Sequence, residues 1–179
     1  MKQISFIKII IFFLVSWTSA ETVMAQGPAQ WYETLPDAEE KKILKGFITK
    51  QQITNDTAFA WYATNRKYNK PNPDVVAVLK EKAYEFQLVF FIGTWCHDSQ
   101  QILPKYFAAL EAAEYPEHYM TIIACDRDKA GPANIQRPFK VVNVPTVLIM
   151  KDGKEVGRIV EFGNTGLVDQ ELAEIVKKL

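Results

Sequence analysis

Cys96 has the side chain in this sequence that is best suited to act as a nucleophile. It lies between a short apolar run, residues 86–92, and a segment whose apolar residues recur at helical spacing. A cysteine at such a junction meets unpaired backbone N–H groups and the positive end of a helix dipole, and both favour the thiolate over the thiol. Because the thiolate is the nucleophilic form of cysteine, Cys96 is predicted to be a nucleophile.

Ser99 follows Cys96 after one helical turn, where its hydroxyl could donate a hydrogen bond to the sulfur. We therefore predict Cys96 and Ser99 as the catalytic residues. The two residues between them act in opposite directions, because protonated His97 would favour the thiolate and ionised Asp98 would oppose it. The sequence leaves that balance open.

The second cysteine, Cys125, ends another apolar run, residues 119–125. Two interpretations are open. If the two apolar runs are neighbouring strands, Cys125 comes to the same sheet edge as Cys96 and could be the resolving cysteine that forms a disulfide with it. A lone cysteine in an apolar run is more commonly a small buried residue.

The two cysteines and the two histidines, His97 and His118, do not indicate a metal site. A zinc cage of cysteine and histidine would require all four residues, and their spacing matches no zinc motif. Binding of a metal by Cys96 and His97 alone is disfavoured. His118 falls in an expected loop and is given no role. We predict neither a metal nor a cofactor.

The segments that must position Cys96 alternate between strand and helix patterns. Strands are predicted at residues 86–92, 119–125, 146–150 and 155–162, and helices from Cys96 to about 114, at 133–140 and at 168–179. The continuous apolar character of residues 86–92 predicts a central strand buried on both faces. Strand, helix and strand in succession predict a right-handed crossover and an α/β fold.

Residues 26–73 are predicted to form an N-terminal helical extension before the main domain, residues 74–179. Within it we expect a helix at 34–50, a short helix at 57–67 and a turn-rich linker at 69–73, after which Asp74 caps the next helix. Three aromatic residues of this region either form a binding patch or, more commonly at such spacings, seal helices against a core: Trp61, Tyr62 and Tyr68.

Residues 1–25 have the pattern of a secretory signal peptide. Two lysines precede an apolar run at 9–17 that is too short to span a membrane, and small residues follow it. Cleavage is expected after Ala25 in preference to Ala20, and an uncleaved signal anchor is the less favoured alternative. Export would place both cysteines where disulfides persist and would leave no stable membrane span after cleavage.

Length and composition limit the class of protein. The 179 residues suit one domain with a hydrophobic core, and 48% hydrophobic with 23% charged residues is typical of a folded, mostly soluble protein. With 21 basic and 21 acidic residues, the formal net charge is zero. No strong field attracts nucleic-acid phosphates, so we expect no nucleic-acid partner.

Three motifs in order resemble the thioredoxin superfamily: WCHDS at 95–99, NVPT at 143–146 and the hairpin KDGKEVGR at 151–158, which a terminal helix follows. The resemblance covers roughly residues 74–179. It implies a thioredoxin-like central mixed sheet flanked by helices, with a redox cysteine at the start of a helix. It also implies a cis peptide bond before Pro145, beside that cysteine.

The resemblance further implies a groove in which backbone next to the cis-proline pairs with an extended substrate chain. The residues that it assigns to substrate binding are Trp95, His97, Asp98, Val144, Pro145 and Thr146. Trp95 would be a lid on the substrate face, and the alternative is an ordinary half-buried aromatic residue. Residues 126–128 either border this face or, as is commoner, form a polar loop after a strand.

The departures from the family pattern change the expected chemistry. Ser99 stands where dithiol members carry a second cysteine, so Cys96 cannot close the usual Cys-x-x-Cys disulfide. The buried acid that the family commonly has six residues before the first cysteine corresponds here to Phe90. Both departures disfavour a dithiol reductase.

We therefore expect an exported thiol–disulfide oxidoreductase that acts through one cysteine, in the periplasm or cell envelope of a bacterium. Its partners would be a cysteine-containing protein or peptide substrate and, as resolving thiol, a low-molecular-weight thiol. The alternative is a non-catalytic thioredoxin-fold module that binds extended polypeptide segments around Trp95 and Pro145.

Overall fold

The computed structural model describes residues 31–37 and 42–179. The predicted signal peptide, residues 1–25, lies outside the described residues, as does the first part of the predicted extension. The elements in chain order are β1 Tyr32–Leu35, β2 Ile43–Ile48, α1 Lys50–Thr54, η1 Thr57–Phe59, α2 Trp61–Arg66, α3 Pro73–Glu81, β3 Gln87–Ile92, α4 His97–Ala112, η2 Glu117–Tyr119, β4 Met120–Ala124, η3 Pro132–Asn134, β5 Thr146–Lys151, β6 Lys154–Val160 and α5 Val168–Val176.

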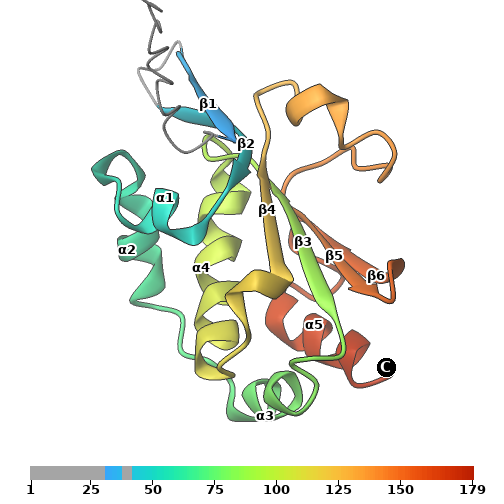
Figure 1. The fold of residues 1–179 in the computed structure, drawn as a ribbon. Coiled ribbons are helices and arrows are strands. Elements are labelled where there is room, and N and C mark those ends of the chain that lie inside the picture. The colour runs from blue at the N-terminus through green and yellow to red at the C-terminus, as the bar shows by residue number, and fades with distance from the viewer. Residues whose placement is uncertain (1–30, 38–41) are drawn as a thin grey trace, which may run out of the picture.

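The strands form one six-stranded mixed sheet in the order β1-β2-β4-β3-β5-β6 (Figure 1). Strands β3 and β4 are parallel and are joined through α4, whereas all other neighbouring pairs are antiparallel. The predicted central position of the 86–92 strand is confirmed, because β3 has a partner on each side and Phe90, Phe91 and Ile92 are fully buried. The predicted α/β class with a mixed sheet flanked by helices is confirmed.

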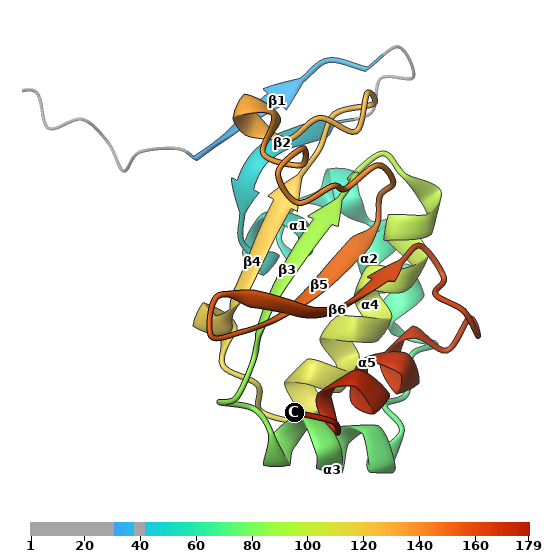
Figure 2. The ribbon, with the colours of Figure 1, turned by 90° about the vertical axis from the view of Figure 1, so that its right-hand side faces the viewer.

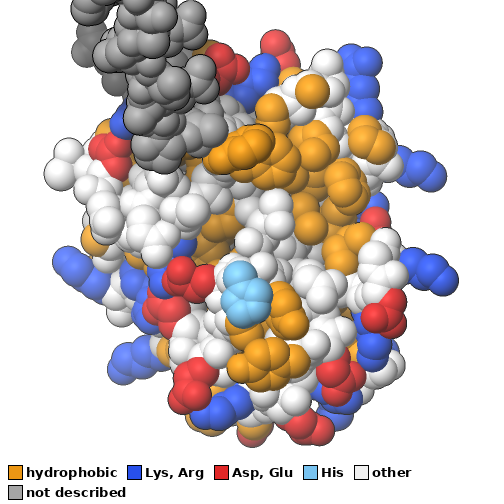
Figure 3. Space-filling view, viewed as in Figure 1, with side chains coloured by type: hydrophobic (Ala, Val, Ile, Leu, Met, Phe, Trp, Pro, Cys, Tyr) orange, Lys and Arg blue, Asp and Glu red, His pale blue; other side chains and the backbone are white. Residues whose placement is uncertain are grey.

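The two faces of the sheet are covered differently (Figure 2). Helices α2, α4 and α5 lie on one face and enclose the main core, to which Phe90, Leu103 and Leu172 belong. The other face carries a smaller core in which Phe91 and Ile123 pack against the segment between β4 and β5. Hydrophobic side chains gather on this face in Figure 3, and the ones that stay partly exposed are Val89, Trp95, Ile135, Phe139 and Met150.

The helix predicted over residues 34–50 is wrong, because this segment forms the antiparallel hairpin strands β1 and β2. Strand β2 extends the sheet by pairing with the free edge of β4, and this long-range pairing overrides the local helical pattern. Gly46 allows β2 to pair with β1 on its other side, since its φ is +136° and a Cβ there would clash with the Trp31 carbonyl oxygen. In the described part of the extension, residues 31–37 and 42–73, the helical elements before α3 are α1, η1 and α2.

Two smaller expectations also differ from the structure. Asn72, not Asp74, caps α3, because its side chain accepts a hydrogen bond from the Asp74 N–H. The helix expected at 133–140 is reduced to η3, in which Ala133 has a left-handed backbone conformation with φ 49°. Of the three aromatic residues considered as a binding patch, Tyr62 is buried in the main core and Trp61 packs against it, whereas Tyr68 is exposed.

Candidate redox site

Cys96 lies where the sequence places it, between the end of β3 and the first residue of α4. It is the N-cap residue of α4, with an extended backbone (φ −80°, ψ 123°), and its side chain is partly exposed. Its Sγ atom donates a hydrogen bond of 3.3 Å to the Val144 carbonyl oxygen. The thiol therefore faces both the amino end of a 16-residue helix and the loop that precedes β5.

The loop before β5 contains the cis peptide bond that the resemblance implies, between Val144 and Pro145. Two hydrogen bonds fix this loop: the Thr146 hydroxyl donates to the Asn143 carbonyl at 2.7 Å, and the Glu161 N–H donates to the Pro145 carbonyl at 2.7 Å. Val144 and Thr146 are both buried. The contact between Cys96 and Val144 thus joins two motifs that are 48 residues apart in the chain.

Ser99 does not have the role that its spacing predicts. Its hydroxyl oxygen is buried and accepts a hydrogen bond of 3.1 Å from the Gly93 N–H, so it holds the turn before Cys96. The Cys96 thiol instead has the Val144 carbonyl as its partner. Ser99 therefore positions the backbone of the cysteine loop and is not a donor to the sulfur.

Replacing Ser99 by alanine should lower the free energy of unfolding by about 1–3 kcal/mol, because the buried Gly93 N–H loses its acceptor. Alkylation of Cys96 in the folded protein should change by less than about threefold, since no bond between the two side chains is lost. Urea unfolding and timed alkylation measure the two quantities. Thr64→Ala is the matched control, because the Thr64 hydroxyl donates an exposed hydrogen bond, to the Ala60 carbonyl. Equal stability of the two variants would contradict this role of Ser99.

Trp95 is held in place and is not a free lid. Its indole N–H donates to the Cys125 carbonyl at 3.0 Å, and a Cβ on Gly93 would lie only 2.8 Å from its ring. The Arg127 guanidinium lies 5.3 Å from the ring centroid on Trp95. The ring is half-buried and rests against the end of the sheet beside Cys96.

His97 and Asp98 lie in the first turn of α4, as expected, but neither has a hydrogen bond with Cys96 among the described residues. His97 is exposed, and its Nε2 atom lies 2.7 Å from Nε2 of Gln101, one turn further along the helix. Asp98 is partly exposed and provides an acidic group in the first turn. These two residues border the opening of the site.

Cys125 is fully buried directly after β4, and both cysteines are free thiols. Burial raises the pKa of the Cys125 thiol to about 12, and the neighbouring Asp126 carboxylate raises it further while Lys45 opposes it. A resolving cysteine must ionise to attack. The structure therefore favours the interpretation of Cys125 as a small buried residue.

Phe90 occupies the place of the family's buried acid with a fully buried aromatic ring. The ring makes edge contacts with Tyr106 and Phe107, at centroid distances of 5.6 and 5.9 Å. Proton transfer through a carboxylate in that place is therefore unavailable to this chain.

Several residues beside the site could not be identified from their sequence neighbourhood. Lys45 on β2 pairs with Asp126 at 2.7 Å. Burial opposes ionisation of Asp126, but the hydrogen bonds from Lys45 and from the Ala130 N–H outweigh it and hold the pKa of that carboxyl below its usual value. Arg127 lies in the polar loop expected after β4, and it also covers Trp95. The Lys45–Asp126 and Arg127–Trp95 contacts join segments that are far apart in the sequence.

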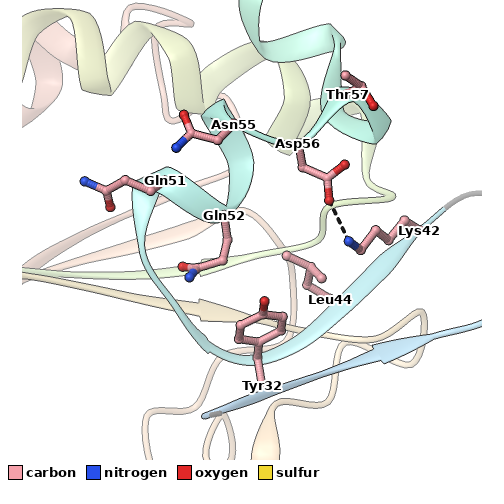
Figure 4. A pocket seen from close by; sticks show the side chains of 8 residues that line it. All are labelled: Tyr32, Lys42, Leu44, Gln51, Gln52, Asn55, Asp56 and Thr57. Atoms are coloured by element: carbon pink, nitrogen blue, oxygen red, sulfur yellow. Dashed lines mark hydrogen bonds and ion pairs between the residues drawn. The ribbon is translucent and has the colours of Figure 1, made fainter. Parts of the chain in front are cut away.

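A separate polar cavity of about 440 Å³ lies between the β1–β2 hairpin and the α1–η1 segment (Figure 4). It is lined by Tyr32, Lys42, Leu44, Gln51, Gln52, Asn55, Asp56 and Thr57. Lys42 and Asp56 form an ion pair of 2.5 Å at its border. Leu44 connects this wall to the cysteine loop, because its N–H donates to the Thr94 hydroxyl at 3.1 Å.

Two features are absent from residues 31–37 and 42–179. No group of three or more histidine, cysteine, aspartate or glutamate side chains there could hold a metal ion. None of the helices in that part of the chain is both long enough and apolar enough to cross a membrane.

Comparison with known proteins identifies the family to which a chain with this cysteine, helix and loop belongs. The thioredoxin family model matches residues 75–177. The chain belongs to the thioredoxin family. The resemblance stated on the motifs is thus confirmed, and membership supports a thioredoxin-like redox function.

Individual thioredoxins match about half of the chain. Thioredoxin of Chlamydia muridarum is 38% identical over 92 residues, which are 51% of this chain and 79% of that protein. Thioredoxin of Mycolicibacterium smegmatis is 34% identical over 88 residues, 49% of this chain and 75% of that protein. The structure of Fasciola hepatica thioredoxin aligns with a TM-score of 0.39 and 24% identity, over 57% of this chain and 88% of that chain. Strands β1 and β2 lie outside the thioredoxin family match.

Proposed function

We propose that this protein is an exported thiol–disulfide oxidoreductase that acts through Cys96 alone on disulfides of proteins or peptides. The observation that carries the proposal is the contrast between its two thiols. Cys96 is partly exposed at the start of α4 and contacts the cis-proline loop, whereas Cys125 is buried with a pKa raised to about 12. With Ser99 in place of a second cysteine, one sulfur is left to carry the reaction.

The reaction proceeds by two exchange steps. The Cys96 thiolate attacks one sulfur of the substrate disulfide, the S–S bond breaks, and the leaving thiolate takes a proton. A second thiol, from outside the chain, then attacks the mixed disulfide and releases Cys96. These two steps regenerate Cys96 and leave that substrate sulfur in a disulfide with the external thiol. A second external thiol then attacks this disulfide, so that the substrate gains two electrons and the two external thiols are joined in one disulfide.

The surroundings of Cys96 suit such a cycle. In the resting thiol, Cys96 Sγ donates a hydrogen bond to the Val144 carbonyl oxygen, so the reacting sulfur lies against the cis-proline loop. Three side chains and the cis-proline loop border the sulfur, where an extended substrate segment would lie: Trp95, His97 and Asp98, with Val144, Pro145 and Thr146 in the loop. The proposed location, a bacterial periplasm or cell envelope, rests on the signal-like pattern of residues 1–25. A low-molecular-weight thiol of that compartment is the proposed resolving partner.

Alkylation of the folded mature protein tests the contrast between the thiols. We expect Cys96 to be labelled at pH 8 without prior reduction, because it is accessible, and Cys125 to be labelled only after unfolding, because burial both shields its sulfur and raises its pKa to about 12. Peptide mass spectrometry follows the two cysteines separately. Labelling of both cysteines only after reduction would reveal a bond between them, and a Cys96 that reacts only after unfolding would favour the binding module over the enzyme.

A further inference from the structure

Asp37 belongs to the N-terminal segment outside the family match, yet it contacts the loop beside the redox site. Its side chain is only 3% exposed. Its two carboxylate oxygens accept hydrogen bonds from Nε and Nη2 of Arg127, at 2.7 and 2.5 Å. This is a bidentate arginine–carboxylate pair, which fixes the plane of the guanidinium as well as its position.

Arg127 transmits this constraint to Trp95. The guanidinium lies over the indole ring, 5.3 Å from its centroid. The indole N–H also donates a hydrogen bond to the Cys125 carbonyl, which holds the ring from a second direction. Trp95 is the residue directly before Cys96. A continuous set of contacts therefore runs from Asp37 to the neighbour of the proposed nucleophile.

The β1–β2 hairpin has a second link to the same loop. The Thr94 hydroxyl accepts from the Leu44 N–H at 3.1 Å and donates to the Lys42 carbonyl at 3.4 Å. Figure 1 shows the hairpin and the amino end of α4 at the same end of the sheet. Residues on both sides of the hairpin connection thus contact residues 94 and 127, and Arg127 in turn contacts Trp95.

The opposite charges of Asp37 and Arg127 indicate what this ion pair does. Asp37 and Arg127 compensate each other, so the pair adds little net charge beside Cys96. Removing one partner leaves the other charge without its bidentate partner, and for the nearly buried Asp37 carboxylate that is costly. The pair is therefore suited to hold a side chain in place and not to attract a charged ligand.

We propose that Asp37 and Arg127 are positioning residues that hold the Trp95 indole beside Cys96, so that the N-terminal hairpin forms part of the substrate-binding face. The kinetic consequence rests on the proposed oxidoreductase function. The positioning of Trp95 does not depend on that function. The experiment therefore has a kinetic arm, which tests substrate binding, and a spectroscopic arm, which tests the position of the ring.

The kinetic arm compares Asp37→Asn and Arg127→Gln with the unmodified protein, using dithiothreitol as the external thiol. For a disulfide-bonded peptide we expect KM to rise about five- to tenfold with kcat changed less than about twofold, because the displaced ring contacts the bound chain and not the reacting sulfur. For 2-hydroxyethyl disulfide, which is too small to extend over the ring, both constants should stay within about twofold of the unmodified protein. The charge-swapped double variant, Asp37→Arg with Arg127→Asp, should recover most of the peptide KM.

The spectroscopic arm uses ¹⁹F NMR of protein labelled with 5-fluorotryptophan, in which Trp95→Phe assigns the resonance. We expect the Trp95 resonance to shift or broaden in both single variants and to return toward its original position in the charge-swapped variant. Glu155→Gln is the matched control, because it removes another bidentate pair, with Arg158 at 2.6 and 2.6 Å, toward the opposite end of β5 from Pro145. Far-UV circular dichroism verifies that each variant is folded.

The outcomes separate the two ideas. An unchanged Trp95 resonance in folded Asp37→Asn and Arg127→Gln would overturn the positioning proposal, as would equal shifts in Glu155→Gln. A shifted resonance with an unchanged peptide KM would overturn the inclusion of the hairpin in the substrate-binding face. If no disulfide is exchanged even by the unmodified protein, the oxidoreductase function fails, and the resonance still decides whether the pair positions the ring.

Discussion

Replacing Cys96 by serine should reduce exchange between a peptide disulfide and an external thiol to the rate measured without protein. Removal of a covalent nucleophile commonly costs a factor on the order of 10⁴ or more, and here the uncatalysed background sets the limit of the loss. No second sulfur can take over, because Cys125 is fully buried and its pKa is raised to about 12. The rate is followed by chromatography of the released peptide thiol.

Cys125→Ala is the matched control, since it removes the other thiol of the chain. We expect its exchange rate to stay within about threefold of the unmodified protein, while its stability falls by about 1 kcal/mol through the small cavity left in the second core. Exchange that survives in Cys96→Ser and disappears in Cys125→Ala would contradict the assignment of the nucleophile.

The same variant separates the enzyme from the binding module. The serine hydroxyl is close in size to the thiol, and the loop bearing Val144 and Pro145 is fixed by its own hydrogen bonds. A module that binds extended polypeptides would therefore keep its affinity for a reduced peptide in Cys96→Ser. Loss of exchange with retained affinity would assign chemistry to the sulfur and binding to the loop.

The sequence predicts the central part of the fold well because that part depends on short-range patterns. The apolar run of β3 and the helical spacing of α4 each lie within one element, and the Asp152–Gly153 turn is local to the β5–β6 hairpin. The position of Cys96 at their junction follows directly. The cis bond before Pro145 follows from the resemblance and from no local pattern.

The sequence fails where the structure depends on distant partners. Strand β2 is a strand because β4 has a free edge, and a helical pattern in residues 34–50 gives no sign of it. Asp37 and Arg127 are separated by 90 residues, so their pairing cannot be read from either neighbourhood. Ser99 illustrates a different limit, since helical spacing places it near Cys96 but does not decide whether its hydroxyl faces the sulfur or the Gly93 N–H.

Two parts of the chain contribute residues to the site. The family-matched segment provides the sulfur, the helix and the cis-proline loop. The hairpin outside that match provides contacts to Thr94 and Arg127, on both sides of the cysteine loop. A fragment restricted to the matched segment would expose the β4 edge and lose the partner of Arg127, so the site is best studied in a chain that includes the hairpin.

Phe90→Asp, which restores the acid that the family commonly has at this place, should unfold this protein and not convert it into a dithiol-type enzyme. Truncating a buried phenylalanine costs about 3–5 kcal/mol. The ring is fully buried against Tyr106 and Phe107, so the carboxyl replacing it would lie among aromatic side chains, and its burial adds several kcal/mol more. The sum is comparable to the whole stability of a typical domain, about 5–15 kcal/mol.

Urea unfolding followed by circular dichroism measures the effect of Phe90→Asp, and Phe90→Leu is the control because it keeps an apolar side chain at that position. We expect the leucine variant to unfold cooperatively with a loss of about 1–2 kcal/mol, and the aspartate variant to lack a native baseline at pH 7. Lower pH should partly restore folding of the aspartate variant, since burial raises the pKa of a carboxyl and the neutral form is cheaper to bury. An aspartate variant as stable as the leucine variant would show that this core accommodates the family's acid, and the absence of that acid would then cease to be an argument against dithiol chemistry on this scaffold.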